Sequence, residues 1–189
     1  MSGPKPRRRQ IRLAPEVYAH PGAVALLTTC TTDRKRIFEH PDHADLVMSE
    51  ISRLHNDDSR VLGFCIMPDH VHLLVLNLKA SLLDFMRVLK GRTAHLLRGH
   101  GAYAVWQGSF HDHLLRRNED ISGTLRYLLD NPVRAGLVDC WTDYPWCGSP
   151  QWPEIDHGFF AVKPANILWA EVLPLGESNS NANTEPGRG

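Results

Sequence analysis

The feature that most constrains the fold of this chain is a pair of apolar runs separated by only two residues. The runs span Arg60 to Met67 and His70 to Leu76, and Pro68-Asp69 lies between them. Proline fixes one backbone angle and aspartate tolerates turn conformations, so this dipeptide favours a tight reversal of the chain. We therefore predict two adjacent antiparallel strands that form a hairpin.

Two segments before and after the hairpin have the periodicity of helices. One runs from Asp42 to Leu54 with Pro41 at its start, and its apolar residues recur at three- and four-residue steps: Ala44, Val47, Met48, Ile51 and Leu54. In the other, Ser81 and Asp84 form a capping pattern, Gly99 and Gly101 end the segment, and the apolar stripe is Leu82, Met86, Leu89, Thr93 and Leu96.

Three further segments complete the predicted order of elements. Ala23 to Thr32 is predicted as a strand, Tyr103 to Arg116 as a strand region broken near Gly108, and Glu119 to Asp130 as a third helix. The order βαββαβ followed by α is typical of an α+β fold, a ferredoxin-like antiparallel sheet with an added C-terminal helix. We divide the chain into a basic N-terminal arm over residues 1–22, one domain over 23–150 and a C-terminal extension over 151–189. The extension is polar from Glu171 onward, and we expect it to be partly disordered.

Charge and composition favour a cytoplasmic protein and only weakly indicate a nucleic-acid partner. The net charge is zero, but residues 60–137 hold 10 Lys and Arg against 6 Asp and Glu, while residues 138–189 hold 2 against 7. No apolar run reaches the roughly 18 to 20 residues of a membrane helix, and the first ten residues are too basic for a signal segment. The four cysteines lack C-x-x-C spacing, so we expect neither a zinc knuckle nor a disulfide framework.

Two histidines of the second hairpin strand form the strongest candidate metal site. His70 and His72 flank Val71, and the period of two along a strand places both imidazoles on one face of the sheet. Such a pair suits a divalent cation. His111 and His113 have the same spacing around Asp112, so they are a second candidate pair that could join the site.

A tyrosine of the third predicted helix lies away from the apolar face of that helix. Ile121, Leu125, Leu128 and Leu129 form one stripe, and Tyr127 lies roughly 145° from its middle at about 100° per residue. Asn131 falls on the same side as Tyr127. It also precedes Pro132, with Gly136 beyond, so it could instead begin a short helical turn.

Four ordered motifs resemble those of the REP-associated tyrosine transposases, a group within the HUH single-tyrosine insertion-sequence transposases. The resemblance covers about Ala23 to Ser149, and the motifs are M-P-D-H-V-H-L-L-V, V-W-Q-G-S-F-H-D-H, R-Y-L-L-D-N-P-V-R-A-G-L-V and D-Y-P-W. It implies the HUH nuclease fold. It also implies Mg²⁺ or Mn²⁺ held by His70, His72 and Asn131, and Tyr127 as the nucleophile that forms a 5′-phosphotyrosine intermediate.

The implied partner is single-stranded or hairpin DNA from palindromic repeats. We expect no membrane partner, and we expect the protein to be a monomer or homodimer. Candidate phosphate contacts are Arg7, Arg8 and Arg9 of the arm and three cations on one side of the second helix, Arg87, Lys90 and Arg98. Trp106, Trp141, Tyr144 and Trp146 could stack on unpaired bases, although packing in the core is the better interpretation of D-Y-P-W.

Three other functions are compatible with the same residues. The chain could be a domesticated nuclease acting on dispersed repeats, a DNA-binding protein without catalysis, or a metallohydrolase that uses the histidine pair and water. A covalent adduct between protein and DNA would exclude the last two.

Overall fold

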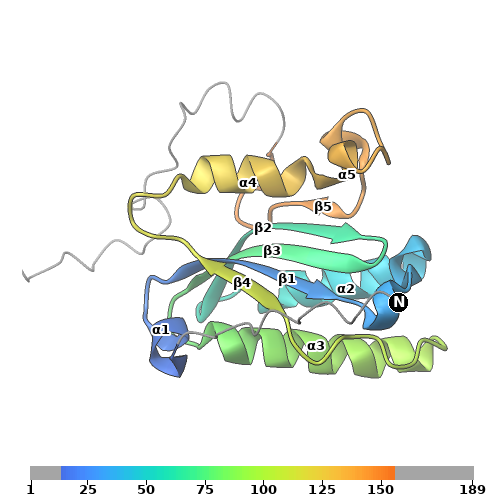
Figure 1. Cartoon of the computed structure of the whole chain (residues 1–189), viewed down its shortest axis with the longest axis horizontal. Helices are drawn as coiled ribbons and strands as arrows, with labels where there is room; N and C mark the ends of the chain where they lie inside the picture. The colour runs from blue at the N-terminus through green and yellow to red at the C-terminus, as the bar shows by residue number, and fades with distance from the viewer. Residues whose placement is uncertain (1–13, 156–189) are drawn as a thin grey trace, which may run out of the picture.

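The computed structural model describes residues 14–155, in which helices cover both faces of a five-stranded antiparallel sheet (Figure 1). The strand order is β4-β1-β3-β2-β5. The strands are β1 (Val24–Cys30), β2 (Ser59–Met67), β3 (His70–Asn77), β4 (His111–Leu114) and β5 (Cys147–Gly148). The helices are α1 (Pro15–Ala19), α2 (Pro41–Leu54), α3 (Leu82–Gly99), α4 (Ile121–Leu129) and α5 (Asn131–Arg134), with 3-10 turns η1 (Thr32–Arg34), η2 (Ile37–Glu39) and η3 (Trp141–Asp143).

The predicted α+β fold class and the ferredoxin-like order of elements are confirmed. From β1 to α4 the chain follows the expected series of strand, helix, two strands, helix, strand and helix. β1 lies between β3 and β4, so the hairpin of β2 and β3 occupies one side of the sheet and β4 the other edge. The segments 1–13 and 156–189, which contain Arg7 to Arg9 and the predicted disorder beyond Glu171, lie outside the described residues.

Alternation along β3 divides the interior into two cores. Val71, Leu73 and Val75 pack on the face covered by α2 and α3, whereas Leu74 and Leu76 pack on the face covered by α4. Figure 1 shows α3 below the sheet and α4 above it. Alternate residues of a strand point to the same face of the sheet, so His70 and His72 lie on the same face as Leu74, which α4 covers.

The two long helices begin and end close to their predicted bounds. Pro41 occupies the first turn of α2, and the hydroxyl of Ser81 accepts a hydrogen bond from the Leu83 amide at the start of α3 (3.2 Å). The apolar stripe of α3 differs at one position. Leu97 is fully buried instead of Leu96, because the stripe follows the 3.6-residue period past Thr93 by four residues.

The predicted strand from Tyr103 to Arg116 was wrong in extent. Only His111–Leu114 pairs with β1, while Trp106 makes an isolated bridge to Thr31. The backbone of Ala104 has a positive φ of 49°, which a strand excludes, and the segment is held as a loop by bonds from Lys90. β5 and α1, at two and five residues, are too short for periodicity and were not predicted.

A bulge in β2 brings α4 close to the sheet. The register with β3 shifts between Val61 and Gly63, so Leu62 and Gly63 both face α4. A Cβ atom at Gly63 would collide with Cδ1 of Leu125, whereas one at Gly148 would meet only ordinary contacts with Phe64 at 3.9 Å. The missing side chain at Gly63 therefore leaves the space that the Leu125 side chain of α4 fills.

We predict that Gly63→Ala lowers the free energy of unfolding by about 1–3 kcal/mol, the usual cost of overpacking a filled core. Gly148→Ala is the matched control and should change stability little. Urea unfolding of the two variants and the parent protein measures both effects. Equal stabilities for Gly63→Ala and the parent would show that α4 has room to move outward.

Candidate active site

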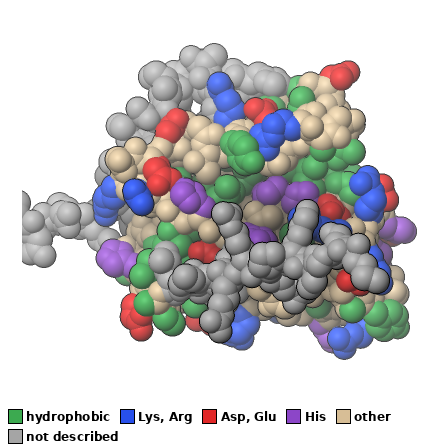
Figure 2. Space-filling view, viewed as in Figure 1, with side chains coloured by type: hydrophobic (Ala, Val, Ile, Leu, Met, Phe, Trp, Pro, Cys, Tyr) green, Lys and Arg blue, Asp and Glu red, His purple; other side chains and the backbone are tan. Residues whose placement is uncertain are grey.

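His70 and His72 lie side by side at the start of β3. Their Nε2 atoms are 3.1 Å apart, and the ring planes cross at 87°. Both side chains are partly exposed, while Val71 between them is fully buried on the other face. Figure 2 shows histidine side chains gathered across the middle of this surface. The two imidazoles therefore lie on one face of the sheet, as the spacing predicted.

The other nitrogen of each imidazole has a hydrogen-bond partner. Nδ1 of His70 contacts Oδ1 of Asp69 at 2.6 Å, and Nδ1 of His72 contacts Oγ1 of Thr28 at 2.8 Å. Asp69 in turn accepts a hydrogen bond from Arg34 (3.2 Å). With Nδ1 donating to these partners, each ring presents the lone pair of Nε2 to the space between them, the arrangement that orients histidines as metal ligands.

The electrostatic surroundings keep His72 in the form that can bind a cation. Burial lowers the pKa of His72 from 6.5 to about 3, and the positive charges of His70, Arg134 and Arg34 act in the same direction. Burial would raise the pKa of Asp69, but its hydrogen bond to His70 and the charges of His70 and Arg34 outweigh burial and lower it. His72 is thus a neutral imidazole and Asp69 a carboxylate near neutral pH.

The spacing of the two Nε2 atoms fits joint coordination of one ion. Nitrogens about 2.1 Å from a metal are about 3.0 to 3.4 Å apart at coordination angles of about 90° to 109°, and the observed separation is 3.1 Å. Within residues 14–155, no three side chains of His, Cys, Asp or Glu form a group that could hold a metal. Further ligands would therefore come from an amide such as that of Asn131, from substrate or from water.

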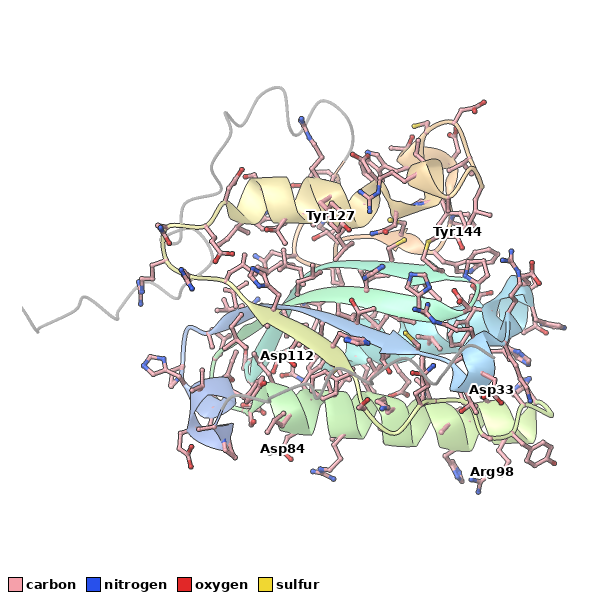
Figure 3. All side chains as sticks on the ribbon, in the orientation of Figure 1. Asp33, Asp84, Arg98, Asp112, Tyr127 and Tyr144 are labelled. Carbon is pink, nitrogen blue, oxygen red and sulfur yellow. The ribbon has the colours of Figure 1, made fainter. Side chains whose placement is uncertain are left out.

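Tyr127 lies on α4, on the opposite side of the sheet from Asp84 and Arg98 of α3 (Figure 3). Its side chain is 53% exposed, whereas the predicted stripe of Ile121, Leu125, Leu128 and Leu129 is buried. The guanidinium carbon of Arg134 lies 3.9 Å from the centre of the Tyr127 ring, within the range of a cation–π contact. The tyrosine is therefore presented to solvent with a positive charge against its ring.

Asn131 joins α4 to α5 through its side chain. Its amide nitrogen donates to the carbonyls of Leu128 (2.9 Å) and Tyr127 (3.3 Å), and its amide oxygen accepts from Arg134 (2.8 Å). The predicted short helical turn is present as α5, and Gly136 follows it with a positive φ of 67°. Among the hydrogen bonds of residues 14–155, none joins Asn131 to either histidine, so its role as a ligand stays a prediction.

Comparison with known proteins agrees with this geometry. Residues 23–115 match the family described as "Transposase IS200 like". A Haemophilus influenzae protein named "Putative REP-associated tyrosine transposase" is 29% identical over 98 residues, which cover 45% of this chain and 56% of that protein. Over residues 23–115 the chain is therefore similar to the IS200-like transposases. It spans just over half the length of this curated relative.

A solved structure of a REP-associated tyrosine transposase bound to a REP hairpin has a similar fold. The TM-score is 0.56 at 19% identity, over 69% of this chain and 78% of that one. At this identity the likeness shows the fold alone. It agrees with the HUH architecture expected from the four motifs, and the resemblance to REP-associated tyrosine transposases is confirmed.

The second histidine pair lies on the same face of the sheet but on the edge strand β4, which β1 separates from β3. His111 is opposite Thr28 in the register of β4 with β1, and Thr28 is opposite His72. Nε2 of His113 contacts Glu119 at 2.7 Å. Both histidines are exposed at the edge strand, and Asp112 between them accepts a hydrogen bond from the Tyr18 hydroxyl (2.7 Å).

The candidate DNA contacts of α3 lie on the face opposite to the histidine pair. Arg87 forms an ion pair with Asp84 (3.1 Å), and Lys90 donates to the carbonyls of Gln107 (2.7 Å) and Ser109 (3.1 Å). Arg98 projects from the far end of α3 (Figure 3). The structure thus groups Arg87, Lys90 and Arg98 along one helix and separates this helix from Tyr127 by the sheet.

Most of the aromatic residues that could stack on unpaired bases instead pack within the protein. Trp141 and Tyr144 are buried, and the Tyr144 hydroxyl donates to the carbonyl of Ile66 (2.9 Å). Trp146 donates to Asp45 (2.8 Å) and packs against Tyr144. The packing interpretation of D-Y-P-W fits these contacts. None of the helices described over residues 14–155 has the length and apolar character needed to span a membrane.

Three residues of the site were missed by sequence reasoning. Thr28 contacts His72 from β1, 44 residues earlier in the chain, and Arg34 contacts Asp69 from η1, 35 residues earlier. Arg134 contacts Tyr127 from α5. Asp33 and Arg34 both have a positive φ of 55°, a strained conformation that is common at functional sites. Only Arg134 carried a usable signal, since it is seven residues, or two helical turns, beyond Tyr127.

We predict that His72 makes the metal-free protein less stable in acid. In the folded protein the pKa of His72 is about 3, below its ordinary value of 6.5. Below pH 6.5 the His72 side chain therefore binds a proton in the unfolded chain but not in the folded chain. At pH 5 this costs about 2 kcal/mol of unfolding free energy. Urea unfolding in EDTA should therefore show that the free energy of unfolding falls more between pH 7 and pH 5 for the parent protein than for His72→Asn. An equal decrease in the two proteins would mean that His72 binds its proton in the folded state.

Proposed function

We propose that this chain cuts and rejoins single-stranded or hairpin DNA, with Tyr127 as the nucleophile and a 5′-phosphotyrosine intermediate. The observation that carries the proposal is the convergence of two Nε2 atoms, 3.1 Å apart, on the face of the sheet that α4 covers. Both rings are fixed through their other nitrogen. The match of residues 23–115 to the IS200-like transposases supports the same reaction class.

The strand transfer requires one bond to form as another breaks. The phenol oxygen of Tyr127 attacks the scissile phosphorus, the new P–O bond joins the strand to the protein, and the bond to the 3′ oxygen breaks. The phenol loses its proton and the departing 3′ oxygen gains one. Because a phosphodiester replaces a phosphodiester, a 3′ hydroxyl can later reverse the step and rejoin DNA without a nucleotide cofactor.

His70, His72 and, after release from Arg134, Asn131 are the side chains that would hold Mg²⁺ or Mn²⁺. When bound, such an ion supplies positive charge that polarises the phosphate and stabilises the charge of the transition state. His72 is suited to this task because burial keeps it neutral. Asp69 and Thr28 fix the two rings, which reduces the reorganisation needed to bring both nitrogens to one point.

Arg134 positions the tyrosine end of the site. It donates to the main-chain carbonyl of Tyr127 (2.9 Å) and to Asn131 (2.8 Å) while its guanidinium faces the Tyr127 ring. This guanidinium is exposed and can also engage a phosphate oxygen beside the phenol. We infer that Arg134 orients Tyr127 toward the substrate.

Two considerations support the proposed substrate class: the access of the scissile phosphate to the site, and the DNA bound to a structurally similar protein. A duplex would place the complementary strand between the sheet and the phosphate to be cut, and opening it costs about 1.4 kcal/mol per stacked step. The structurally similar transposase was solved with a REP hairpin, which supports folded single-stranded DNA as the substrate here. A hairpin offers a helical stem for position and an unpaired flank for cleavage.

We predict that Thr28→Val weakens Mn²⁺ binding about 10–100-fold, the usual cost of removing the partner that orients a histidine ligand. Thr29→Val is the matched control, because Thr29 is buried on the other face and its hydroxyl lacks a hydrogen-bond partner among the described residues. Isothermal titration calorimetry compares the variants. Equal affinities for Thr28→Val and Thr29→Val would remove Thr28 from the site.

We predict that Tyr127→Phe eliminates the covalent adduct with hairpin oligonucleotides in Mg²⁺ or Mn²⁺, while folding is retained because the ring is exposed. Tyr103→Phe, at a 70% exposed tyrosine, should form the adduct normally. The adduct is detected on a denaturing gel with one labelled strand, alone and annealed to its complement. An adduct formed by Tyr127→Phe would contradict the proposed nucleophile. An adduct formed by the parent protein in EDTA would contradict the proposed metal dependence, and equal adduct formation on the annealed duplex would contradict the proposed single-stranded substrate.

A further inference from the structure

We propose that a groove between α3 and the loop over residues 101–110 binds unpaired nucleotides of the DNA flank. The inference deepens the proposed function, since it names where the single-stranded part of the substrate lies. It concerns a surface outside the histidine and tyrosine site. The groove, its charge, the indole ring of Trp106 and its position relative to Asp69 each support it.

The groove consists of two adjoining cavities of about 410 and 370 Å³ that share Lys90 and Gly108. Each is large enough for a nucleotide-sized ligand. The first continues along α3 to Arg87 and Leu83, and the second to Arg98. The two cavities together therefore follow α3 over more than three turns, as a strand of several nucleotides requires.

The floor of the groove is open because two residues facing it have no side chain. Gly91 lies in the middle of α3, where glycine disfavours the helix. A Cβ at Gly91 or at Gly108 would have no atom within 4 Å, so packing does not require glycine at either position. Glycine here leaves the helix surface accessible to a ligand.

The charge of the groove is positive. Arg87, Lys90 and Arg98 line it, and no carboxylate is among the residues that line either cavity. Asp84, the nearest acid on α3, is paired with Arg87 at one end. The guanidinium of Arg98 makes no hydrogen bond or ion pair within the described part of the chain, so it is available to a phosphate. An anionic polymer fits this lining better than a peptide or a second copy of the chain.

An aromatic ring is placed where a base could stack. Trp106 lines the groove, and its indole nitrogen donates to Thr93 (3.0 Å), which fixes the ring. A fixed indole beside a cationic channel is a usual element of single-strand binding.

The groove begins at the end of the sheet that holds the histidine pair. The Thr31 amide donates to the carbonyl of Asp69 (2.9 Å), and the Thr32 amide donates to the carbonyl of Val105 (2.9 Å). Thr31 also bridges to Trp106. A strand that leaves His70 can thus pass over this edge and enter the groove within a few nucleotides.

The test uses Gly91→Leu, which fills the groove and favours the helix. The matched control is Gly99→Leu, at a glycine of the same helix that also has open space but does not line either cavity. The probes are a fluorescent hairpin with a single-stranded tail of about eight thymidines and the same hairpin without a tail. Fluorescence anisotropy in EDTA measures affinity without cleavage.

We expect Gly91→Leu to fold with an equal or higher melting temperature and to bind the tailed hairpin about tenfold more weakly, the loss of roughly one stacked base. Its affinity for the hairpin without a tail should match that of Gly99→Leu. Arg98→Gln should reduce the slope of log affinity against log salt by about 0.7 for the tailed probe only. The inference would be overturned if Gly91→Leu bound the tailed probe with unchanged affinity, or if it lost equal affinity for both probes. A changed oligomeric state instead of a changed affinity would also overturn it. Loss of tail affinity without any adduct in the parent protein would retain the groove and reject the proposed chemistry.

Discussion

The site depends on the pairing of β3 with β1 directly after the turn at Pro68-Asp69. Alternation along β3 directs His70 and His72 to one face, and the register with β1 sets Thr28 against His72. The turn itself supplies Asp69 to His70, and Thr31 holds that turn through the Asp69 carbonyl. The residues that close the hairpin therefore also orient the proposed ligands. Burial keeps His72 neutral, which is the form that the proposed binding of a cation requires.

The position of Tyr127 depends on a second constraint, the close approach of α4 to β2. Gly63 removes the side chain that would push Leu125 outward, and the bulge before it turns two consecutive residues toward α4. The buried stripe of α4 fixes the rotation of the helix and so exposes Tyr127. Arg134 then ties the ring to α5. Apolar packing therefore determines where the proposed nucleophile lies, and the polar contacts of Arg134 determine how its ring is oriented.

The sequence predicted the features that depend on local periodicity. The hairpin, α2, α3 and the exposed face of Tyr127 all follow from spacing within one segment, and the structure has them. Thr28 and Arg34 could not be found this way, because their contacts depend on strand register and on a left-handed turn distant in the chain. The extent of β4 was wrong for a related reason, since contacts from Lys90 hold residues before it as a loop. The functional roles of the site residues and the domain bounds at 22 and 150 stay predictions.

The most direct test of the account is the position of a bound ion. Crystals of the protein soaked with Mn²⁺ and measured near the manganese absorption edge would locate it by anomalous scattering. The account predicts one peak within about 2.0 to 2.3 Å of Nε2 of both His70 and His72. A protein that binds Mn²⁺ only elsewhere, for example between His113 and Glu119, would contradict it.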